Sequence, residues 1–185
     1  MTGKIPLLVL AGPTAAGKSA LALRLAPLLE TDIISADSAQ VYRGLDIGTA
    51  KPTAVEQKLV RHHLIDLVEP DEDYSVADYQ RDARQMIERL WHRGRLPFIV
   101  GGTGLYLRAV IENYAFGTRG KDEALRARLN KEADSAGSAA LHHRLKRLDP
   151  AAAAKIHPRD RRRIIRALEV FTLEGRPISG QVERT

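Results

Sequence analysis

Eight residues near the N-terminus have the types and spacing that bind a polyphosphate. They are Gly12, Pro13, Thr14, Ala15, Ala16, Gly17, Lys18 and Ser19, and they fit the pattern G-x-x-x-x-G-K-[ST]. Glycines at both ends let the backbone turn tightly, so that successive N–H groups point at one anion. Lys18 adds a full positive charge, and the Ser19 hydroxyl can bind a Mg²⁺ ion that bridges two phosphates. The sequence therefore predicts a polyphosphate-binding loop with Mg²⁺ as its cofactor.

The residues on either side of this loop predict the elements that would position it. Residues 5–11 are mostly apolar and predict a buried parallel strand that enters the loop. Residues 19–25 are rich in good helix formers and predict a helix that leaves it. The N-terminus of that helix would add a partial positive charge next to the bound anion. Because strand, loop and helix follow in the right order, a chance glycine-rich turn is the less favoured interpretation.

A carboxylate is predicted at the end of the next strand. Residues 32–36 predict that strand, and its C-terminal end leads into Asp37. Ligands collect at this end of the strands in an open parallel sheet. Asp37 could take a proton from an acceptor that attacks the bound donor, or it could hold a Mg²⁺-bound water. We favour the general base, because Ser19 already offers a hydroxyl to the metal and Asp37 leads into a long, ordered loop at 38–52.

A cluster of glycines follows another predicted strand. Residues 97–100 are apolar and lead into Gly101, Gly102, Thr103 and Gly104. Glycines at the mouth of a parallel strand let the backbone approach a ligand closely. Because this cluster lies near the phosphate-binding loop in the predicted sheet, we expect it to border the same site.

The other elements up to residue 112 alternate between strand and helix. Residues 53–60 predict a short helix, residues 63–68 a strand, and Ser75 opens a longer helix with a near capping box that Gly94 ends. The apolar residues at helical spacing would form its buried face: Val76, Tyr79, Ala83, Met86, Ile87, Leu90 and Trp91. Alternation of this kind predicts right-handed crossovers and a mostly parallel sheet.

The basic charge of the chain is concentrated in one segment. Residues 119–166 hold 14 Lys and Arg against 6 Asp and Glu, a net charge of +8, whereas the remaining residues have a net charge of −2. Helical patterns at 121–136, 138–148 and 160–173 replace the strands here. The segment is either a nucleic-acid-binding insertion or a solvated basic one, and the unequal charge favours nucleic acid.

The last of these helices has an arginine-rich face. Arg159, Arg163 and Arg166 would share it, while Ile164, Ile165 and Leu168 turn toward the core. Guanidinium groups bind phosphate oxygens and bases well.

The chain as a whole is predicted to be an α/β protein with a P-loop NTPase-like parallel sheet flanked by helices and an all-helical insertion. We place the α/β core at 1–117, the basic helical insertion at 118–175 and the start of a return to the core at 176–185. The absence of cysteine excludes disulfides and thiolate metal sites, and no stretch is long and apolar enough to span a bilayer. The histidines lack carboxylates at metal-ligand spacing, so no zinc site is expected. We expect a cytoplasmic monomer that does not contact membranes.

Four stretches together resemble tRNA dimethylallyltransferase, also called tRNA isopentenyltransferase. They lie at residues 12–19, 37–52, 100–106 and 160–169. Members of this family move a dimethylallyl group from its diphosphate to N6 of the adenosine 3′ of the anticodon in tRNA. The resemblance implies that the loop at 12–19 holds the diphosphate of dimethylallyl diphosphate and that Asp37 is the base on N6.

The same resemblance assigns further residues to the acceptor. Thr103 would hold the adenine near the donor, and the anticodon stem-loop would contact the residues at family positions known for it: Asp37, Ser38, Ala39, Gln40, Thr103, Arg126, Arg162, Arg163, Ile164, Ile165 and Arg166. Arg162 stands where many members have glutamine. Members usually run well past residue 185, so we expect a fragment or a shortened copy whose donor site can form while tRNA affinity and turnover are impaired.

Three other functions are compatible with parts of the pattern. A small-molecule kinase with a phosphate-binding loop also has a carboxylate after its second strand. An adenylate isopentenyltransferase shares the donor chemistry, although a free mononucleotide would need no basic segment. A non-catalytic RNA-binding module could retain the fold.

Overall fold

The computed structural model describes residues 4–114 and 122–181. The chain divides into two compact units, Met1–Ile111 and Glu112–Thr185. The boundary predicted between residues 117 and 118 lies outside the described residues.

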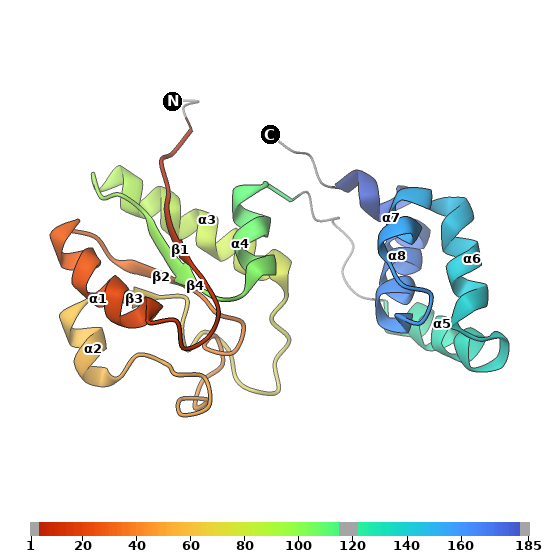
Figure 1. Cartoon of the computed structure of the whole chain (residues 1–185), viewed down its shortest axis with the longest axis horizontal. Coiled ribbons are helices and arrows are strands. Elements are labelled where there is room, and N and C mark those ends of the chain that lie inside the picture. The colour runs from red at the N-terminus through yellow and green to blue at the C-terminus, as the bar shows by residue number, and fades with distance from the viewer. Residues whose placement is uncertain (1–3, 115–121, 182–185) are drawn as a thin grey trace. The chain divides into compact units, whose positions relative to one another are not determined.

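The first unit is a parallel sheet flanked by helices (Figure 1). Its four strands are β1 (Leu8–Ala11), β2 (Ile33–Ala36), β3 (His62–His63) and β4 (Phe98–Gly101), and they lie in the order β1-β4-β2-β3 with all pairs parallel. The helices between and after them are α1 (Lys18–Leu28), α2 (Ala54–Leu59), α3 (Val76–His92) and α4 (Gly104–Ile111). The predicted parallel α/β core is confirmed.

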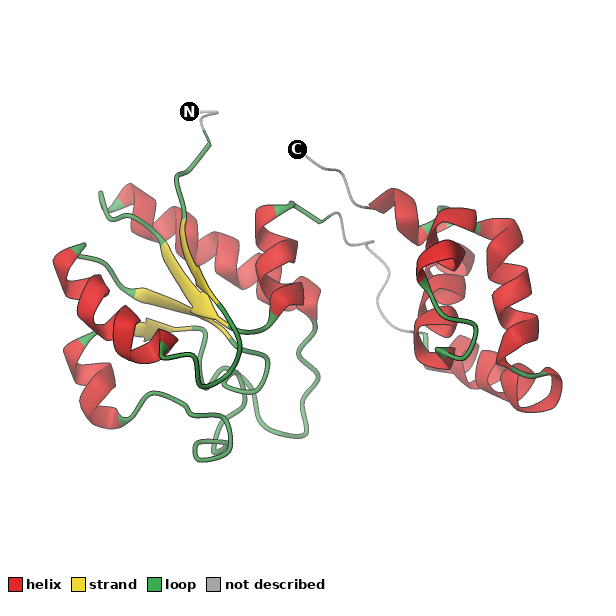
Figure 2. Ribbon diagram, in the orientation of Figure 1, coloured by secondary structure: helices red, strands yellow, loops and turns green. Residues whose placement is uncertain are grey.

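Successive side chains of the central strands point to opposite faces, which gives the sheet two cores. Ile34 and Ile99 pack with α3 and α4 on one face. Ile33, Phe98 and Val100 pack with α1 on the other. Figure 2 shows these helices on the two sides of the strands. Because both faces are covered, the central strands are mostly apolar instead of alternating with polar residues, and Ser35 is the one polar residue in β2 and β4.

Two predicted strands differ from the structure. The strand expected at 63–68 is wrong beyond His63, because Leu64 and Asp66 have positive φ angles of 61° and 52° that end the extended backbone. The first strand was expected to be buried, but β1 pairs only with β4 within the described residues, so its side chains are half-buried or exposed.

Helix α3 begins and ends as its sequence predicts. The Ser75 side chain accepts a hydrogen bond from the Asp78 amide, and the Asp78 carboxylate accepts one from the Ser75 amide, which completes a capping box. Gly94 follows the helix with a φ of 71°. The predicted buried face is correct for Tyr79, Ala83, Ile87 and Leu90, with Val76 and Met86 partly buried. It is wrong for Trp91, which is 42% exposed at the edge of that face.

The second unit is entirely helical in its described residues. It consists of α5 (Glu123–Ala136), α6 (Ser138–Leu148), α7 (Pro150–Lys155), α8 (Arg161–Glu174) and the short 3-10 helix η1 (Ile178–Gln181). Apolar side chains from α5, α6, α7 and α8 form its core. Asp149 caps α7 and also accepts hydrogen bonds from the amide and hydroxyl of Ser179, so η1 packs against this unit.

The arginine-rich face needs one correction. Asp160 is the N-cap of α8, so Arg159 precedes the helix and does not share a helical face with Arg163 and Arg166. None of the helices among the described residues combines the length and apolar character that crossing a bilayer requires.

Candidate active site

The loop at 12–19 connects β1 to α1 through two residues with left-handed backbone. Gly17, the N-cap of α1, has a φ of 77°, and Ala15 has a φ of 64°. The glycine adopts this conformation freely, whereas it costs an alanine about 1 kcal/mol or more. Backbone that departs from the right-handed region in this way forms concave surfaces whose N–H groups bind anions. The Lys18 ammonium donates to the Pro13 carbonyl at 2.6 Å and so folds back over the loop.

Asp37 follows β2 directly and is held by its own turn. Its Oδ1 accepts hydrogen bonds from the amides of Ala39 at 2.9 Å and Gln40 at 3.4 Å. Within the part of the chain that the structure describes, Oδ2 accepts no hydrogen bond. The carboxylate is half-buried. One oxygen therefore fixes the side chain, and the other is available to a substrate.

Thr103 binds the residue that follows Asp37. Its Oγ1 accepts from the Ser38 amide at 3.0 Å, and its own amide donates to the Ala36 carbonyl at 3.1 Å. Thr103 thereby joins the end of β4 to the end of β2. Close packing at this point requires glycine, because a Cβ at Gly101 would lie 2.2 Å from the Ala36 carbonyl oxygen. The expected close approach of the backbone is present, but at Gly101 the approach is between β4 and β2 and not toward a ligand.

One cavity of about 340 Å³ brings predicted donor residues together with Asp37 and Gln40, whereas Ser38, Ala39 and Thr103 are not among its lining residues. Lys18 and Ser19 line it from α1, Asp37 and Gln40 line it from the loop after β2, and Gly102 lines it from the end of β4. The cavity is also lined by residues that were not predicted as site residues, namely Lys51, Pro52, Glu56 and His62. Burial lowers the pKa of His62, so this side chain is neutral at neutral pH.

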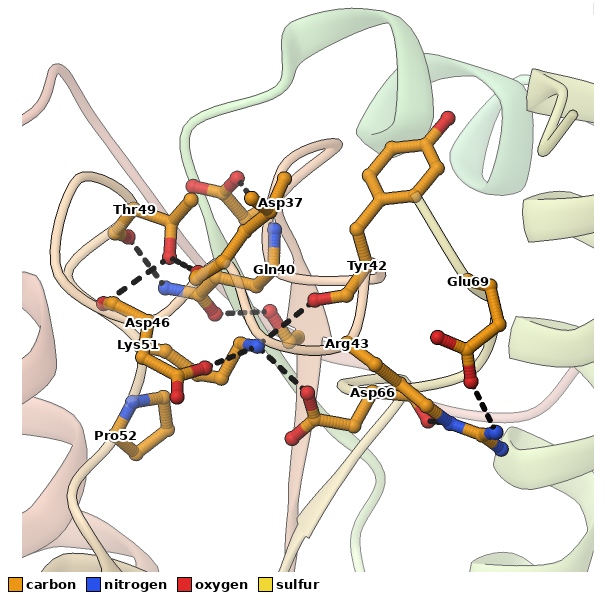
Figure 3. A network of polar contacts seen from close by, with 12 residues as sticks. Asp37, Gln40, Tyr42, Arg43, Asp46, Thr49, Lys51, Pro52, Asp66 and Glu69 are labelled. Carbon is orange, nitrogen blue, oxygen red and sulfur yellow. Dashed lines mark hydrogen bonds and ion pairs between the residues drawn. The ribbon is translucent and has the colours of Figure 1, made fainter. Parts of the chain in front are cut away.

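A polar network behind Asp37 fixes the loop at 38–52 (Figure 3). Gln40 Nε2 donates to the carbonyls of Thr49 and Ala50, both at 3.1 Å, and Gln40 Oε1 accepts from Ser35 Oγ at 2.9 Å. Both amide hydrogens are therefore used within the protein. The resemblance implies that Gln40 contacts the acceptor, and donation from this side-chain amide to the acceptor would require those bonds to break.

The predicted nucleic-acid residues of the second unit surround a buried carboxylate. Glu169 is 0% exposed and accepts from Arg126 Nε at 2.7 Å, Arg126 Nη2 at 2.9 Å, Arg166 Nη1 at 2.7 Å and the Asp122 amide at 3.0 Å. Burial by itself would raise the pKa of Glu169, but these hydrogen bonds and the arginine charges lower it to about 2. One negative charge thus holds two guanidinium groups, which leaves a net positive charge at this position.

The remaining predicted residues of α8 divide into two groups. Arg163 has a side chain that is 73% exposed, and Arg162 is also exposed. Ile164 and Ile165 are 0% and 5% exposed and lie in the core of the second unit, so their side chains do not offer a surface to tRNA. A role for α8 in binding therefore rests on its arginines.

Comparison with known proteins identifies the family. A family model described as IPP transferase matches residues 40–185. The chain belongs to the IPP transferase family. A relative named tRNA dimethylallyltransferase, from Pelotomaculum thermopropionicum, is 53% identical over 176 residues, and the match covers 95% of this chain and 56% of the relative. Another of the same name, from Moorella thermoacetica, is 54% identical and is covered to 57%. The chain spans little more than half the length of these relatives.

Solved structures agree with this family assignment. The full-length tRNA isopentenylpyrophosphate transferase from Bacillus halodurans is 51% identical, with a TM-score of 0.61 over 94% of this chain and 57% of that one. A eukaryotic dimethylallyltransferase captured acting on tRNA is 30% identical, with a TM-score of 0.75 over 96% of this chain and 44% of that one. The P-loop NTPase-like fold expected from the sequence is that of these family members.

Sequence reasoning missed Lys51 and Glu169, which organise the two predicted sites in this family member. Lys51 lies in a stretch without periodicity, and nothing local indicates that its ammonium is buried. Glu169 gave a usable signal, because it lies one helical turn after Ile165 and therefore on the apolar face of α8. A charged residue on a buried face needs partners of opposite charge.

Proposed function

We propose that this protein transfers a dimethylallyl group from dimethylallyl diphosphate to N6 of the adenosine 3′ of the anticodon in tRNA. The observation that supports the proposal is that Lys18, Ser19 and Asp37 line the same cavity. Its volume of about 340 Å³ lies at the small end of the range for small-molecule sites. Family membership supplies the reaction class, and the cavity supplies a place for it.

In the proposed reaction, the bond between the allylic carbon and the diphosphate oxygen breaks as the bond from N6 to that carbon forms. The amide groups of residues 12–19 and the Lys18 ammonium would stabilise charge on the departing diphosphate. The N6 proton would move to Asp37 Oδ2, since Oδ1 is held by the amides of Ala39 and Gln40. An exocyclic adenine amine is a weak nucleophile, so positioning the two substrates carries much of the catalytic burden.

The protein supplies only part of the ligand set that a Mg²⁺ ion would need on the donor side of the cavity. The Ser19 hydroxyl is exposed at the start of α1 and lines the cavity. Among the described residues, no group of three or more His, Asp or Glu could hold a metal ion. We therefore infer that Mg²⁺, when bound, would be held by Ser19 together with the diphosphate oxygens and would neutralise their charge.

The acceptor is proposed to be a tRNA anticodon stem-loop whose target base is extruded into the cavity. The charge of the second unit supports a polyanionic acceptor, and Arg162 and Arg163 are exposed on α8, the side chain of Arg163 to 73%.

The proposal is tested by incubating the chain with labelled dimethylallyl diphosphate, Mg²⁺ and unmodified tRNA that has adenosine after the anticodon. We expect label in tRNA, and a loss of about 10²- to 10⁴-fold in rate for Asp37→Asn with tRNA binding retained. Asp71→Asn, in an exposed turn, is the matched control. Label transferred to AMP and not to tRNA would indicate an adenylate isopentenyltransferase, and phosphate transfer from ATP a kinase. Binding of tRNA with no transfer to any acceptor would indicate an RNA-binding module.

A further inference from the structure

A buried ammonium group lies behind the loop that carries Asp37. The side chain of Lys51 is only 3% exposed, although its residue lines the cavity. Its Nζ contacts the Tyr42 carbonyl at 2.8 Å, Asp46 Oδ1 at 2.7 Å and Asp66 Oδ1 at 2.6 Å (Figure 3). An ammonium group has three hydrogens to donate, and these three acceptors use all of them. Lys51 is therefore not a phosphate ligand, in contrast to Lys18.

The three acceptors come from two parts of the first unit. Tyr42 and Asp46 belong to the loop at 38–52, and Asp66 belongs to the segment after β3. The backbone of that segment also pairs with the loop, because the Asp66 amide donates to the Gln40 carbonyl at 3.0 Å and the Leu67 amide to the Val41 carbonyl at 2.7 Å. Lys51 thus ties the end of the loop to its middle and to the neighbouring segment.

A second link leads from Lys51 to Asp37. Gln40 holds the carbonyls of Thr49 and Ala50, the two residues before Lys51. The backbone amide of Gln40 in turn donates to Asp37 Oδ1 and belongs to the turn that fixes this oxygen. Displacement of Lys51 would therefore disturb the Asp37 carboxylate through the side chain of Gln40.

Removing the ammonium would do more than delete three hydrogen bonds. Asp46 and Asp66 both lie within 2.7 Å of Nζ, so without it two carboxylates face each other across the same space. Like charges at such a distance repel, and their side chains are 65% and 40% exposed, so the loop can open into solvent.

We propose that Lys51 is a positioning residue that holds the loop at 38–52 so that Asp37 meets the acceptor amine. The role rests on the transfer reaction proposed above. Lys51 touches neither substrate in this proposal and acts through Gln40 and the turn at Asp37.

The test compares Lys51→Met with Lys58→Met, an exposed lysine on α2. Three quantities are measured: amide hydrogen exchange across residues 38–51, the dissociation constant of inorganic pyrophosphate, and kcat and KM for prenyl transfer to tRNA. We expect Lys51→Met to speed exchange at 38–43 by about tenfold or more, because the opened loop exposes its amides. We also expect kcat to fall by about 10- to 100-fold, since small misplacements of a reacting group are costly.

Pyrophosphate affinity and the KM for dimethylallyl diphosphate should change by less than about twofold, because among the described residues no hydrogen bond or ion pair joins Lys51 to residues 12–19. A general loss of structure would not lower kcat while leaving KM unchanged. If Lys51→Met fails to fold, Asp46→Asn, which removes one of the two carboxylate charges at an exposed position, should move exchange and kcat in the same direction by a smaller factor.

Unchanged exchange at 38–43 would overturn the proposal, and so would faster exchange with an unchanged kcat. If the unaltered chain transfers no prenyl group, the proposed function fails, while exchange and pyrophosphate binding still decide whether Lys51 orders the loop independently of the donor site.

Discussion

The buried carboxylate of Glu169 offers the most quantitative test of the second unit. Glutamine has nearly the same shape as glutamate and resembles its protonated form, so Glu169→Gln removes the charge and leaves the packing in place. The guanidinium groups of Arg126 and Arg166 would then face a neutral acceptor instead of a carboxylate. The change isolates what the negative charge contributes to the free energy of unfolding.

The size of that contribution follows from the pKa of Glu169. Folding lowers it from 4.5 to about 2, and each pKa unit corresponds to about 1.4 kcal/mol, so the charge stabilises the folded unit by about 3 kcal/mol. Because the folded pKa is the lower one, the stabilisation is fully present above pH 4.5 and is lost as the pH falls toward 2. Glu169→Gln should therefore cost about 3 kcal/mol at pH 7 and progressively less below pH 4.5.

Amide hydrogen exchange in α5 and α8 measures the stability of the second unit by itself. Fluorescence of Trp91, the only tryptophan, reports on the first unit in the same sample and should not change. The matched control is Glu132→Gln, whose partner Arg144 lies 3.3 Å away and whose side chain is 42% exposed, so its loss should cost less than about 1 kcal/mol. A loss below about 1 kcal/mol for Glu169→Gln at pH 7, or a loss that does not shrink with acid, would refute this reasoning.

Two further substitutions test the packing that supports the sites. Gly101→Ala should destabilise the first unit by about 3 kcal/mol or more in urea unfolding followed by Trp91 fluorescence, because its Cβ would lie 2.2 Å from the Ala36 carbonyl oxygen. Gly104→Ala, where a Cβ meets nothing within 4 Å, is the control, and equal losses for the two would contradict the steric argument. Asp149→Ala should cost the second unit about 2 kcal/mol, measured by amide exchange in α7, because it removes the cap of α7 and the acceptor for Ser179. A change confined to η1, with α7 unaffected, would show that the cap contributes little.

The sequence predicted well those features that depend on neighbours along the chain. The loop at 12–19, the capping box at Ser75 and the glycine that ends α3, Gly94, are local patterns, and each has the predicted conformation. The central strands were also predictable, because a strand covered on both faces is mostly apolar. Residues at the edges of elements were less predictable. Trp91 has the helical spacing of the buried residues of α3, yet it is 42% exposed.

The sequence by itself determined the chemistry available to this protein: a loop with the pattern of a phosphate-binding loop, a carboxylate at the end of the next strand and a segment with excess positive charge. Only the tertiary structure decided which polar groups remain available to substrates. It commits all three hydrogens of Lys51 to the protein, uses the side-chain amide of Gln40 internally and buries Glu169 between two arginines. The reason is that hydrogen bonds and ion pairs between residues far apart in the chain depend on distances that no local pattern encodes, while the cost of burying an unpaired charge requires that they form.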